Sequence, residues 1–417
     1  MNRSTRTVRT GAVAAMALAA AVALAACGAD DDEPRDLTVW IMDPGTAEAE
    51  QAVDEAVRAF ESRHEDVRVT VDYLPWAQAY DRLTAAAAGG AAPDLAELST
   101  GWTPEFAATG ALDPVEPADD HVPALVEGAT VDGVTYGYPW YGGARALVYR
   151  TDILDRAGVE PPATWDEMLT VGEQIVAAEP DVAPIHVAGE YSHWFIPLIW
   201  AAGGEIAVAA GDGWRPGVDS AAGRAAFAHY QQLWQAGWTP DDGLDWTSMD
   251  VRRAFADGRA AMMIAASWDL AAVLERNPDL ADRVGVSLLP AGPGGSRDAF
   301  AGGSHLAVFE RSAHPDLAHE FAQLLISAEH APGFAAAIGF LPGTADGVRV
   351  AVGDDLYAPF GTQLVDHARS YPPAAWWSRV ESDRVFVDEM RRLLTGEQDV
   401  DQTVTAIDEA LRAAAAG

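Results

Sequence analysis

The chain of 417 residues is 49% hydrophobic and 9% aromatic, which is too apolar for a disordered chain and long enough for two domains. Its formal net charge of −36 repels polyanions, so the composition argues against nucleic-acid binding. All 27 basic residues are arginine, which excludes Schiff-base chemistry and phosphate-binding loops that depend on lysine.

The N-terminal segment has the layout of an export signal. Three arginines precede an apolar run over residues 11–26, which is shorter than the roughly 20 residues of a membrane span. A membrane anchor is the alternative interpretation. The run ends in Leu-Ala-Ala-Cys, which resembles the lipobox of bacterial lipoproteins. That resemblance implies cleavage before Cys27 and acylation of its thiol, and more than one acyl chain anchors a protein stably. We therefore predict a signal peptide over 1–26, a tether over 27–35 and a location on the extracellular face of the cell membrane.

The predicted elements of the first half alternate between strands and helices. Apolar or alternating patterns predict strands in DLTVWIMD, VRVTVDYL and APDLAEL. Helical spacing of apolar residues predicts a helix over 47–62, and a second helix, in WAQAYDRLTAAAAGG, ends at two glycines. This order of elements predicts βαβ units and a parallel sheet.

The second half continues the alternation. PPATWDEMLTVGEQIVAA predicts a helix with a capping box of Thr164 and Glu167, and the helix AAGRAAFAHYQQLWQAG ends at Gly237. MDVRRAFADGRAAMMIAASW predicts a helix, a turn and a buried strand. RVGVSLLPAGPGG and AGGSHLAVFE predict two strands joined by a Gly/Pro loop, and HPDLAHEFAQLLIS and VDQTVTAIDEALRAAA predict amphipathic helices.

Several segments, in this order, resemble the bacterial extracellular solute-binding proteins of the carbohydrate type, which are the receptors of ABC importers. The likeness is carried by APDLAELSTGWTPEFAATGALDPV, YGYPWYGGARALVYRTDILDRAGVEPPATWDEM, GRAAMMIAASWDL, the segment from LLPAGPGG to HPDLAHEFAQLL, and GFLPG. It covers nearly the whole chain after the leader. YGYPWY and the following YRTD are most similar to receptors for disaccharides and other short oligosaccharides.

The resemblance implies an α/β fold of two lobes, each a sheet flanked by helices, with the ligand in the cleft between them. By analogy, residues 36–143 and 283–309 form the N-terminal lobe, and residues 144–282 and 310–417 form the C-terminal lobe. The receptor closes around its ligand by hinge motion and then docks on the permease. The permease and its ATPase are separate chains, and the receptor is expected to be a monomer.

The residue types of the chain suit a sugar, whose apolar ring faces are covered by aromatic planes and whose hydroxyls are bound by carboxylates, amides and arginines. Turn, strand-end and family positions together predict a ligand site without catalytic residues, metal or cofactor. Its predicted members are Asp43, Glu97, Thr100, Trp102, Trp140, Tyr141, Arg145, His193, Trp194, Trp268, Gly303, Ser304, Trp376, Trp377 and Arg379.

Each of these residues also has a simpler interpretation. Tryptophans commonly pack in cores, and Asp43 is also suited to capping the following helix. Glu97 is the stronger candidate, because a charge at the tip of an apolar strand needs a reason. Arg145 is equally suited to a salt bridge between the lobes, and His193 to a hydrogen-bonded place in the core.

Three alternative functions stay open from the sequence. An exported glycoside-acting enzyme needs two carboxylates about 5–10 Å apart, which Asp43 and Glu97 are the candidates to supply. A surface scaffolding lipoprotein needs no aromatic cleft. The third alternative is a receptor of the same family for a non-sugar solute.

Overall fold

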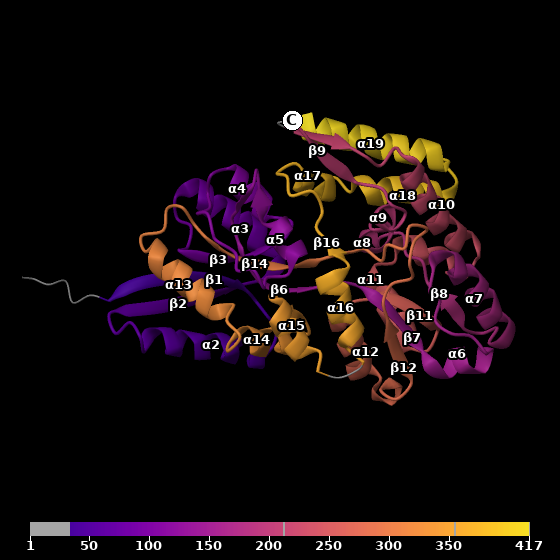
Figure 1. The fold of residues 1–417 in the computed structure, drawn as a ribbon, viewed down its shortest axis with the longest axis horizontal. Helices are drawn as coiled ribbons and strands as arrows, with labels where there is room; N and C mark the ends of the chain where they lie inside the picture. Colours follow the sequence, from indigo (N-terminus) through magenta and orange to yellow (C-terminus); the bar gives the residue numbers. More distant parts are fainter. Residues whose placement is uncertain (1–33, 212, 354–355, 417) are drawn as a thin grey trace, which may run out of the picture.

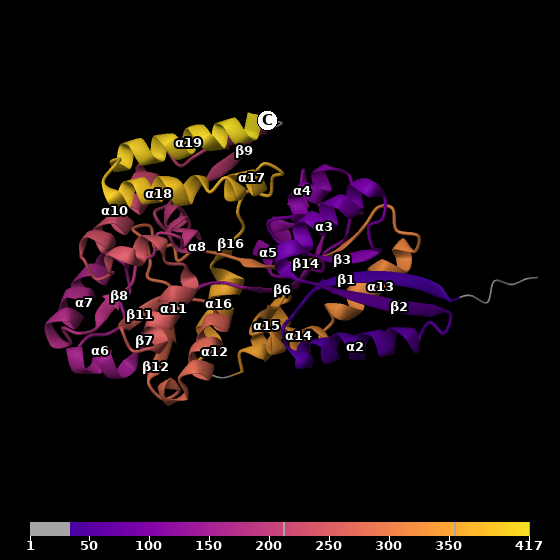
Figure 2. The same cartoon turned by 180° about the vertical axis from the view of Figure 1, so that it is seen from behind.

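The computed structural model describes residues 34–416 except 212 and 354–355, and it has two lobes side by side (Figures 1 and 2). The predicted signal peptide and Cys27 lie outside the described residues. Within the described part of the chain, no helix is both long and apolar enough to cross a membrane.

The first lobe is built on a mixed sheet that has six strands among the described residues, in the order β15-β6-β14-β3-β1-β2. Its strands are β1 (Arg35–Met42), β2 (Val67–Leu74), β3 (Leu95–Ser99), β6 (Tyr138–Gly143), β14 (Gly302–Val308) and β15 (Leu341–Pro342). β1 runs parallel to β2 and β3, as the βαβ pattern predicts, whereas β14 runs antiparallel to β3 and β6.

Helices cover both faces of this sheet (Figure 1). α2 begins at Ala47 because the Thr46 hydroxyl accepts a hydrogen bond from the Ala49 N–H, and its buried stripe of Val53, Ala56 and Phe60 packs into the lobe's core. The helices of the first lobe are α2 (Ala47–Glu61), α3 (Trp76–Gly89), α4 (Thr103–Ala108), α5 (Pro123–Gly128), α13 (Pro315–Leu325) and α14 (Ala331–Ala337), and its hairpin consists of β4 (Thr130–Val131) and β5 (Val134–Thr135).

The second lobe has a sheet that contains four strands among the described residues, in the order β12-β7-β11-β8. They are β7 (Ala146–Arg150), β8 (Ala183–Ile185), β11 (Ala260–Ala265) and β12 (Val284–Ser287). Every residue of β11 is buried, as its continuous apolar run predicts. Half of the predicted capping box of α7 is confirmed, because the Thr164 hydroxyl accepts from the Glu167 N–H, whereas the Glu167 carboxylate accepts from the Ala163 N–H instead of from Thr164.

The second lobe contains most of the remaining elements. They are α6 (Thr151–Ala157), α7 (Trp165–Ala178), α8 (Ser192–Phe195), α9 (Leu198–Ala201), β9 (Ala207–Ala210), β10 (Gly213–Pro216), α10 (Ala221–Gln235), α11 (Ser248–Ala256), α12 (Ser267–Arg276), α17 (Trp377–Ser382), α18 (Val385–Thr395) and α19 (Val400–Ala416), with short 3-10 helices at Asp241–Asp245 and Pro278–Leu280.

The chain crosses between the lobes at several places. β6 ends in the first sheet at Gly143, and β7 begins in the second at Ala146. A second crossing runs through β13 (Ala299–Phe300), which pairs with β16 (Ala368–Arg369) before the chain enters β14. After β15, the chain returns through α15 (Ala345–Ala351) and α16 (Ala358–Asp366).

Two parts of the expected lobe division are wrong. Residues 283–309 were expected in the first lobe, but β12 pairs with β7 in the second sheet. Residues 310–417 were expected in the second lobe, but α13 and α14 bury Phe321 and Phe334 in the core of the first lobe, and β15 pairs with β6. The late strands β12 and β14 are thus in different sheets, and the Gly/Pro loop that follows β12 leads into an interlobe crossing.

Candidate functional site

A cavity of about 240 Å³ lies between the two lobes, and residues from both border it. The first lobe contributes Trp76, just after β2, and the segment that follows β3, because carboxyl ends of neighbouring parallel strands meet at one edge of a sheet. The lining residues are Trp76, Ser99, Thr100, Gly101, Trp102, Tyr141, Arg145, His193, Trp268, Phe300, Gly302, Gly303, Ser304, Phe340 and Glu381.

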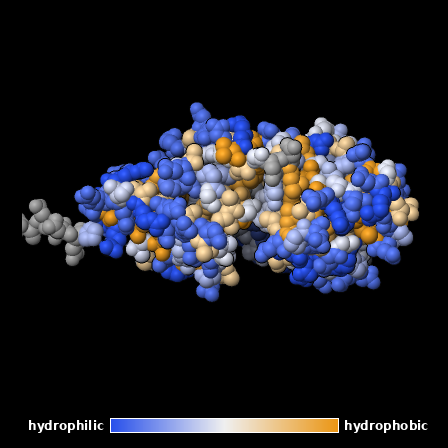
Figure 3. All heavy atoms as spheres, turned by 90° about the horizontal axis from the view of Figure 1, so that it is seen from below, coloured by the Kyte–Doolittle hydropathy of each residue, from blue (hydrophilic) through white to orange (hydrophobic). Residues whose placement is uncertain are grey.

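The cleft continues into an outer cavity of about 510 Å³, which shares Trp102 and Glu381 with the inner one. Its other lining residues come from α3 and α4 on one side and from α17 and the loop before it on the other: Tyr80, Glu105, Ala375, Ser378, Arg379 and Ser382. A space-filling view of one side of the molecule shows a hollow near its middle, with apolar residues gathered beside it (Figure 3).

Aromatic rings form walls on both sides of the inner cavity. Trp102 of the first lobe packs against Trp76 and Tyr80, with ring centroids 5.7 and 5.4 Å away. Trp76 is 44% exposed, which is unusual for so large an apolar side chain. These rings offer flat apolar surface at the point where the two lobes face each other.

Trp268, at the start of α12, joins the two lobes. Its ring stacks on Phe340 of the first lobe, with centroids 4.1 Å apart and planes 16° apart. The neighbouring Ser267 hydroxyl donates to the Gly339 carbonyl at 2.8 Å. Trp268 also packs on the β6–β7 crossing, because a Cβ added at Gly143 would lie 2.6 Å from the Trp268 ring.

A buried carboxylate lies under the first-lobe side of the cavity. Glu97 in β3 accepts from the Met42 N–H at 2.8 Å and from the Tyr141 hydroxyl. The Tyr141 oxygen in turn accepts from the Ser304 hydroxyl at 2.9 Å. Because Glu97 is fully buried, burial raises its pKa to about 7, although these hydrogen bonds act in the opposite direction.

Arg145 brings a positive charge to the cavity from the β6–β7 crossing. Its Nε donates to the Tyr191 hydroxyl at 2.8 Å, and the guanidinium lies over the rings of Tyr191 and Trp268, at 5.2 and 5.9 Å from their centroids. Burial opposes the charged form, but the electrostatic effect of Tyr191 and Asp269 outweighs it and raises the pKa of Arg145. The guanidinium therefore stays charged.

His193 borders the same cavity from α8. Its Nδ1 lies 3.0 Å from the Tyr371 hydroxyl, and its ring stacks on Phe300 with a centroid distance of 4.8 Å. Burial, helped by the charge of Arg145, lowers the pKa of His193 to about 3, so the ring is neutral at physiological pH. The neutral imidazole packs as an aromatic ring beside the cleft.

Residues 43–332 match the profile of the family described as bacterial extracellular solute-binding protein, which spans more than half of the chain. The chain belongs to this family. Membership confirms the predicted resemblance and implies an exported protein, in the periplasm or at the cell surface.

Individual members of the family resemble this solute-binding protein over most of its length. The diacetylchitobiose binding protein DasA of Streptomyces coelicolor is 28% identical over 385 residues, covering 87% of this chain and 88% of the relative. The sugar-binding protein MalE of Xanthomonas citri superposes with a TM-score of 0.80 at 27% identity, covering 91% of this chain and 97% of that one. The GacH receptor of Streptomyces glaucescens has been solved unliganded and with acarbose. It superposes with a TM-score of 0.76 at 25% identity, covering 92% of this chain and 99% of that one. These neighbours confirm the two-lobed α/β fold.

Most of the predicted site residues of this solute-binding protein reach the cleft. The outer cavity includes Arg379, and Glu97 lies beneath the inner cavity, behind Tyr141. The predicted residues that line the inner cavity are Thr100, Trp102, Tyr141, Arg145, His193, Trp268, Gly303 and Ser304.

The structure does not bring five predicted residues to either cavity. Asp43 is exposed and accepts a hydrogen bond from the Gly45 N–H in a local turn. It does not cap the following helix either, because the N-cap of α2 is Thr46. Trp140 stacks on Phe334 in the first-lobe core. The other three pack in or against the second-lobe core because they lie among its aromatic rings: Trp194, Trp376 and Trp377.

Several cleft residues were not predicted. Trp76 has a sequence signal, because it follows a predicted strand in a chain whose parallel strands end at one edge. Phe340 belongs to the quoted GFLPG segment, yet nothing in that segment indicates that its ring reaches Trp268. Tyr80 and Glu381 have no local signal, since their place depends on how α3 and α17 pack.

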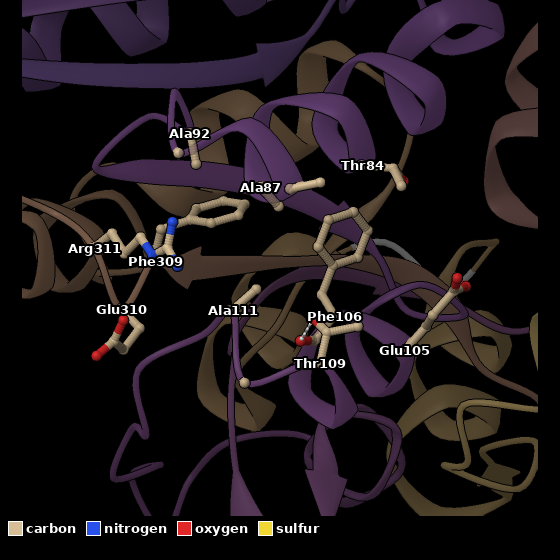
Figure 4. Close-up of a pocket in the computed structure, with 13 residues that line it drawn as sticks. Thr84, Ala87, Ala92, Glu105, Phe106, Thr109, Ala111, Phe309, Glu310 and Arg311 are labelled. Carbon is tan, nitrogen blue, oxygen red and sulfur yellow. Dashed lines mark hydrogen bonds between the residues drawn. The ribbon is translucent and has the colours of Figure 1, made fainter.

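A separate cavity of about 320 Å³ lies within the first lobe alone (Figure 4). The rings of Phe106 and Phe309 and small residues of α3 form its walls, and Glu105 and Arg311 lie at its ends. It borders no residue of the second lobe, so it lacks the two-sided enclosure of the cleft. Within the described residues, no group of three or more His, Cys, Asp or Glu side chains is arranged to hold a metal ion.

Proposed function

We propose that this solute-binding protein captures a short carbohydrate, a disaccharide or oligosaccharide, between its lobes and delivers it to the permease of an ABC importer. The observation that carries the proposal is the aromatic surface on both sides of one cavity: Trp76 and Trp102 from the first lobe and Trp268 from the second. Flat rings cover the apolar faces of a sugar, and Arg145 and Glu381 supply polar contacts for its hydroxyls.

The known ligands of similar proteins support this proposal. DasA is named for diacetylchitobiose, and GacH has been solved with acarbose. A ligand that contacts both lobes stabilises the closed arrangement over the open one and so shifts the population toward it. The closed receptor, acting as a monomer, then docks on a permease whose ATPase is a separate chain.

We propose binding without chemistry. Asp43 lies outside both cavities, and Glu97 is covered by Tyr141 and Ser304, so these carboxylates do not flank a common space for substrate. Asp43 and Glu97 therefore do not form the acid and base pair that a glycoside-acting enzyme needs.

A ligand screen by thermal unfolding tests the proposal. The exported chain is heated with a panel of mono-, di- and oligosaccharides, and each sugar is recovered afterwards. A ligand that binds only the folded state at about 100 times its Kd adds about 2.7 kcal/mol of stability, which is a clear shift in Tm. We expect a shift with one class of sugar and unchanged sugar in the recovered sample. A cleaved sugar would indicate an enzyme, and no shift with any sugar would contradict the carbohydrate ligand.

We further propose that the chain is exported by residues 1–26 and held on the membrane by acylated Cys27. This proposal rests on the leader sequence and on the extracellular family. The substitution Cys27→Ser removes the thiol that would carry the lipid, so we expect the protein to leave the membrane fraction. The measurement is the distribution of protein between washed membranes and medium. A serine variant that stays on membranes would contradict the lipid anchor.

A further inference from the structure

The cleft contains a buried charge without a counter-charge. Arg145 is only 7% exposed and borders the inner cavity. Among the described residues, its only hydrogen-bond partner is the Tyr191 hydroxyl, which is bonded to Nε. Its two terminal nitrogens have no partner in that part of the chain, and no described carboxylate lies within 4 Å of them to form an ion pair.

The strand that follows Arg145 contains a matched arginine with the opposite arrangement. Arg150, the last residue of β7, is 8% exposed, so the two arginine residues are buried to nearly the same extent. Arg150 donates from Nε and a terminal nitrogen to the two oxygens of Asp152, both at 2.7 Å. A buried guanidinium that keeps its charge is stabilised by such a two-point pair, and Arg145 lacks one.

The other charges near Arg145 do not fill this place. Asp269 attracts it electrostatically, but the Asp269 carboxylate is bonded to the Ala266 N–H at 3.1 Å and to Arg252 at 3.3 Å. Glu381 lines the same cavity without forming an ion pair with Arg145 among the described contacts. The rings of Tyr191 and Trp268 stabilise a cation only partly.

We propose that the sugar carries a carboxylate, as a uronic acid does, and that this carboxylate binds the terminal nitrogens of Arg145 in the cleft. The inference rests on the proposed carbohydrate-binding function and specifies its ligand class. A carboxylate has two oxygens in one plane, which match the planar fork of a guanidinium. The aromatic walls formed by Trp102 and Trp268 then cover the sugar rings on either side.

Matched pairs of sugars that differ at the carboxyl group test this inference. The exported chain is titrated calorimetrically with α-1,4-digalacturonate and α-1,4-galactobiose, and with cellobiouronate and cellobiose. We expect the acidic member of at least one pair to bind tenfold or more tightly than its neutral partner, with affinity that falls as salt is raised.

The outcomes separate the two proposals. If a neutral sugar binds and no acidic member binds more tightly, the carboxylate inference is wrong and the carbohydrate function stands. If no sugar in these pairs or in the wider panel binds, both are wrong. A tighter fit for maltose 6-phosphate than for any uronate would replace the carboxylate by a phosphate and overturn the assignment.

Substitution of the two arginines supplies the internal control. Arg145→Gln is expected to reduce the acidic-over-neutral preference at least tenfold, while Arg145→Lys keeps the charge and part of the preference. Arg150→Gln breaks a satisfied pair, so it is expected to lower Tm and leave the preference unchanged. Without ligand, Arg145→Gln should unfold no earlier than the natural chain, because it removes an unpaired buried charge. A large loss of Tm in Arg145→Gln would indicate that the arginine is structural.

Discussion

The tryptophan rings of the cleft differ from the other tryptophans in what covers them. Trp140 and Trp194 are covered on all sides by the protein, whereas Trp102 and Trp268 each border the interlobe cavity. Only a ring that borders the cavity loses contact with water when a ligand arrives. The binding energy of a sugar should therefore depend on a few rings rather than on the tryptophan content of the chain.

We predict that Trp268→Ala and Trp102→Ala each weaken sugar binding tenfold or more, which corresponds to about 1.4 kcal/mol. The measurement is calorimetric titration with the sugar found by the ligand screen. Trp214→Ala is the control, because that ring packs on Trp376 and borders neither cavity of the cleft. Equal losses in all three variants would mean a general effect on folding instead of a contact with ligand.

The buried carboxylate of Glu97 is expected to make the stability of the fold depend on pH. Its pKa is raised by burial from 4.5 to about 7, so the folded protein binds this proton more tightly than the unfolded chain. Such a group stabilises the fold fully below about pH 4.5, and that stabilisation is lost as the pH rises through 7. The shift corresponds to about 3 kcal/mol, at about 1.4 kcal/mol per pKa unit.

Glu97→Gln imitates the protonated form, because its amide accepts from the Met42 N–H and donates to Tyr141. We expect the difference in unfolding free energy, variant minus natural chain, to increase by about 1–3 kcal/mol when the pH is raised from 5 to 8. Denaturant unfolding of the ligand-free proteins at both pH values measures this difference. Asp43→Asn changes an exposed carboxylate and should follow the natural chain at both. A constant difference between Glu97→Gln and the natural chain would contradict the raised pKa.

At the scale of elements, the site depends on a close approach between β14 and β6. Gly303 lies opposite Gly142, and a Cβ on Gly303 would lie 2.2 Å from the Tyr141 carbonyl oxygen. No side chain fits between these strands without moving one of them. The glycine therefore brings Ser304 and Tyr141 together beneath the cavity.

Gly303→Ala is accordingly expected to lower the free energy of unfolding by about 1–3 kcal/mol and to weaken ligand binding, since the added methyl pushes β14 from β6. Unfolding by denaturant and sugar titration measure the two effects. Gly294→Ala has nothing within 4 Å of the new Cβ and should be neutral. A Gly303→Ala variant as stable as Gly294→Ala would show that the strands adjust without cost.

Local patterns predicted most elements but not their partners. The strand over DLTVWIMD, the cap at Thr164 and the buried strand β11 are where periodicity and capping place them. β12 and β14 were both predicted as strands, yet they belong to different sheets. A strand's own pattern specifies that it is extended and buried, whereas its neighbours depend on packing across the whole chain.

Because local patterns do not specify packing, they also did not separate the residues that line the cavity from their neighbours in the core. Trp140 and Tyr141 are adjacent on β6, at a bulge in its pairing with β14, and their ring centroids lie 5.4 Å apart. Tyr141 meets Glu97 at the cavity, and Trp140 stacks on Phe334 in the core. Both residues were predicted for the site, but only Tyr141 lines the cavity, and the sequence does not distinguish them because every residue of β6 is buried.

At the scale of the whole molecule, crossing segments and contacts across the cleft join the two lobes. We predict that sugar binding shortens the distance between the outer edges of the lobes. Ala108 in α4 and Asp383 beyond α17 are exposed and lie in different lobes. Since the chain has a single cysteine, Ala108→Cys and Asp383→Cys in a Cys27→Ser background provide two specific labelling sites. Energy transfer between the labels should increase with sugar, and an unchanged signal at saturation would contradict closure.

The contact between Trp268 and Phe340 has a mechanical consequence. Together with the Ser267–Gly339 hydrogen bond and the packing of Trp268 on Gly143, it fixes the lobes to each other beside the first crossing. A rotation about this point moves nearby atoms little and distant atoms far, as at a fulcrum. If the lobes close around a sugar as proposed, a small adjustment beside the ligand becomes a large displacement at the outer edges of the lobes. A permease that contacts those edges would then distinguish the ligand-bound receptor from the ligand-free one by a large difference in their positions.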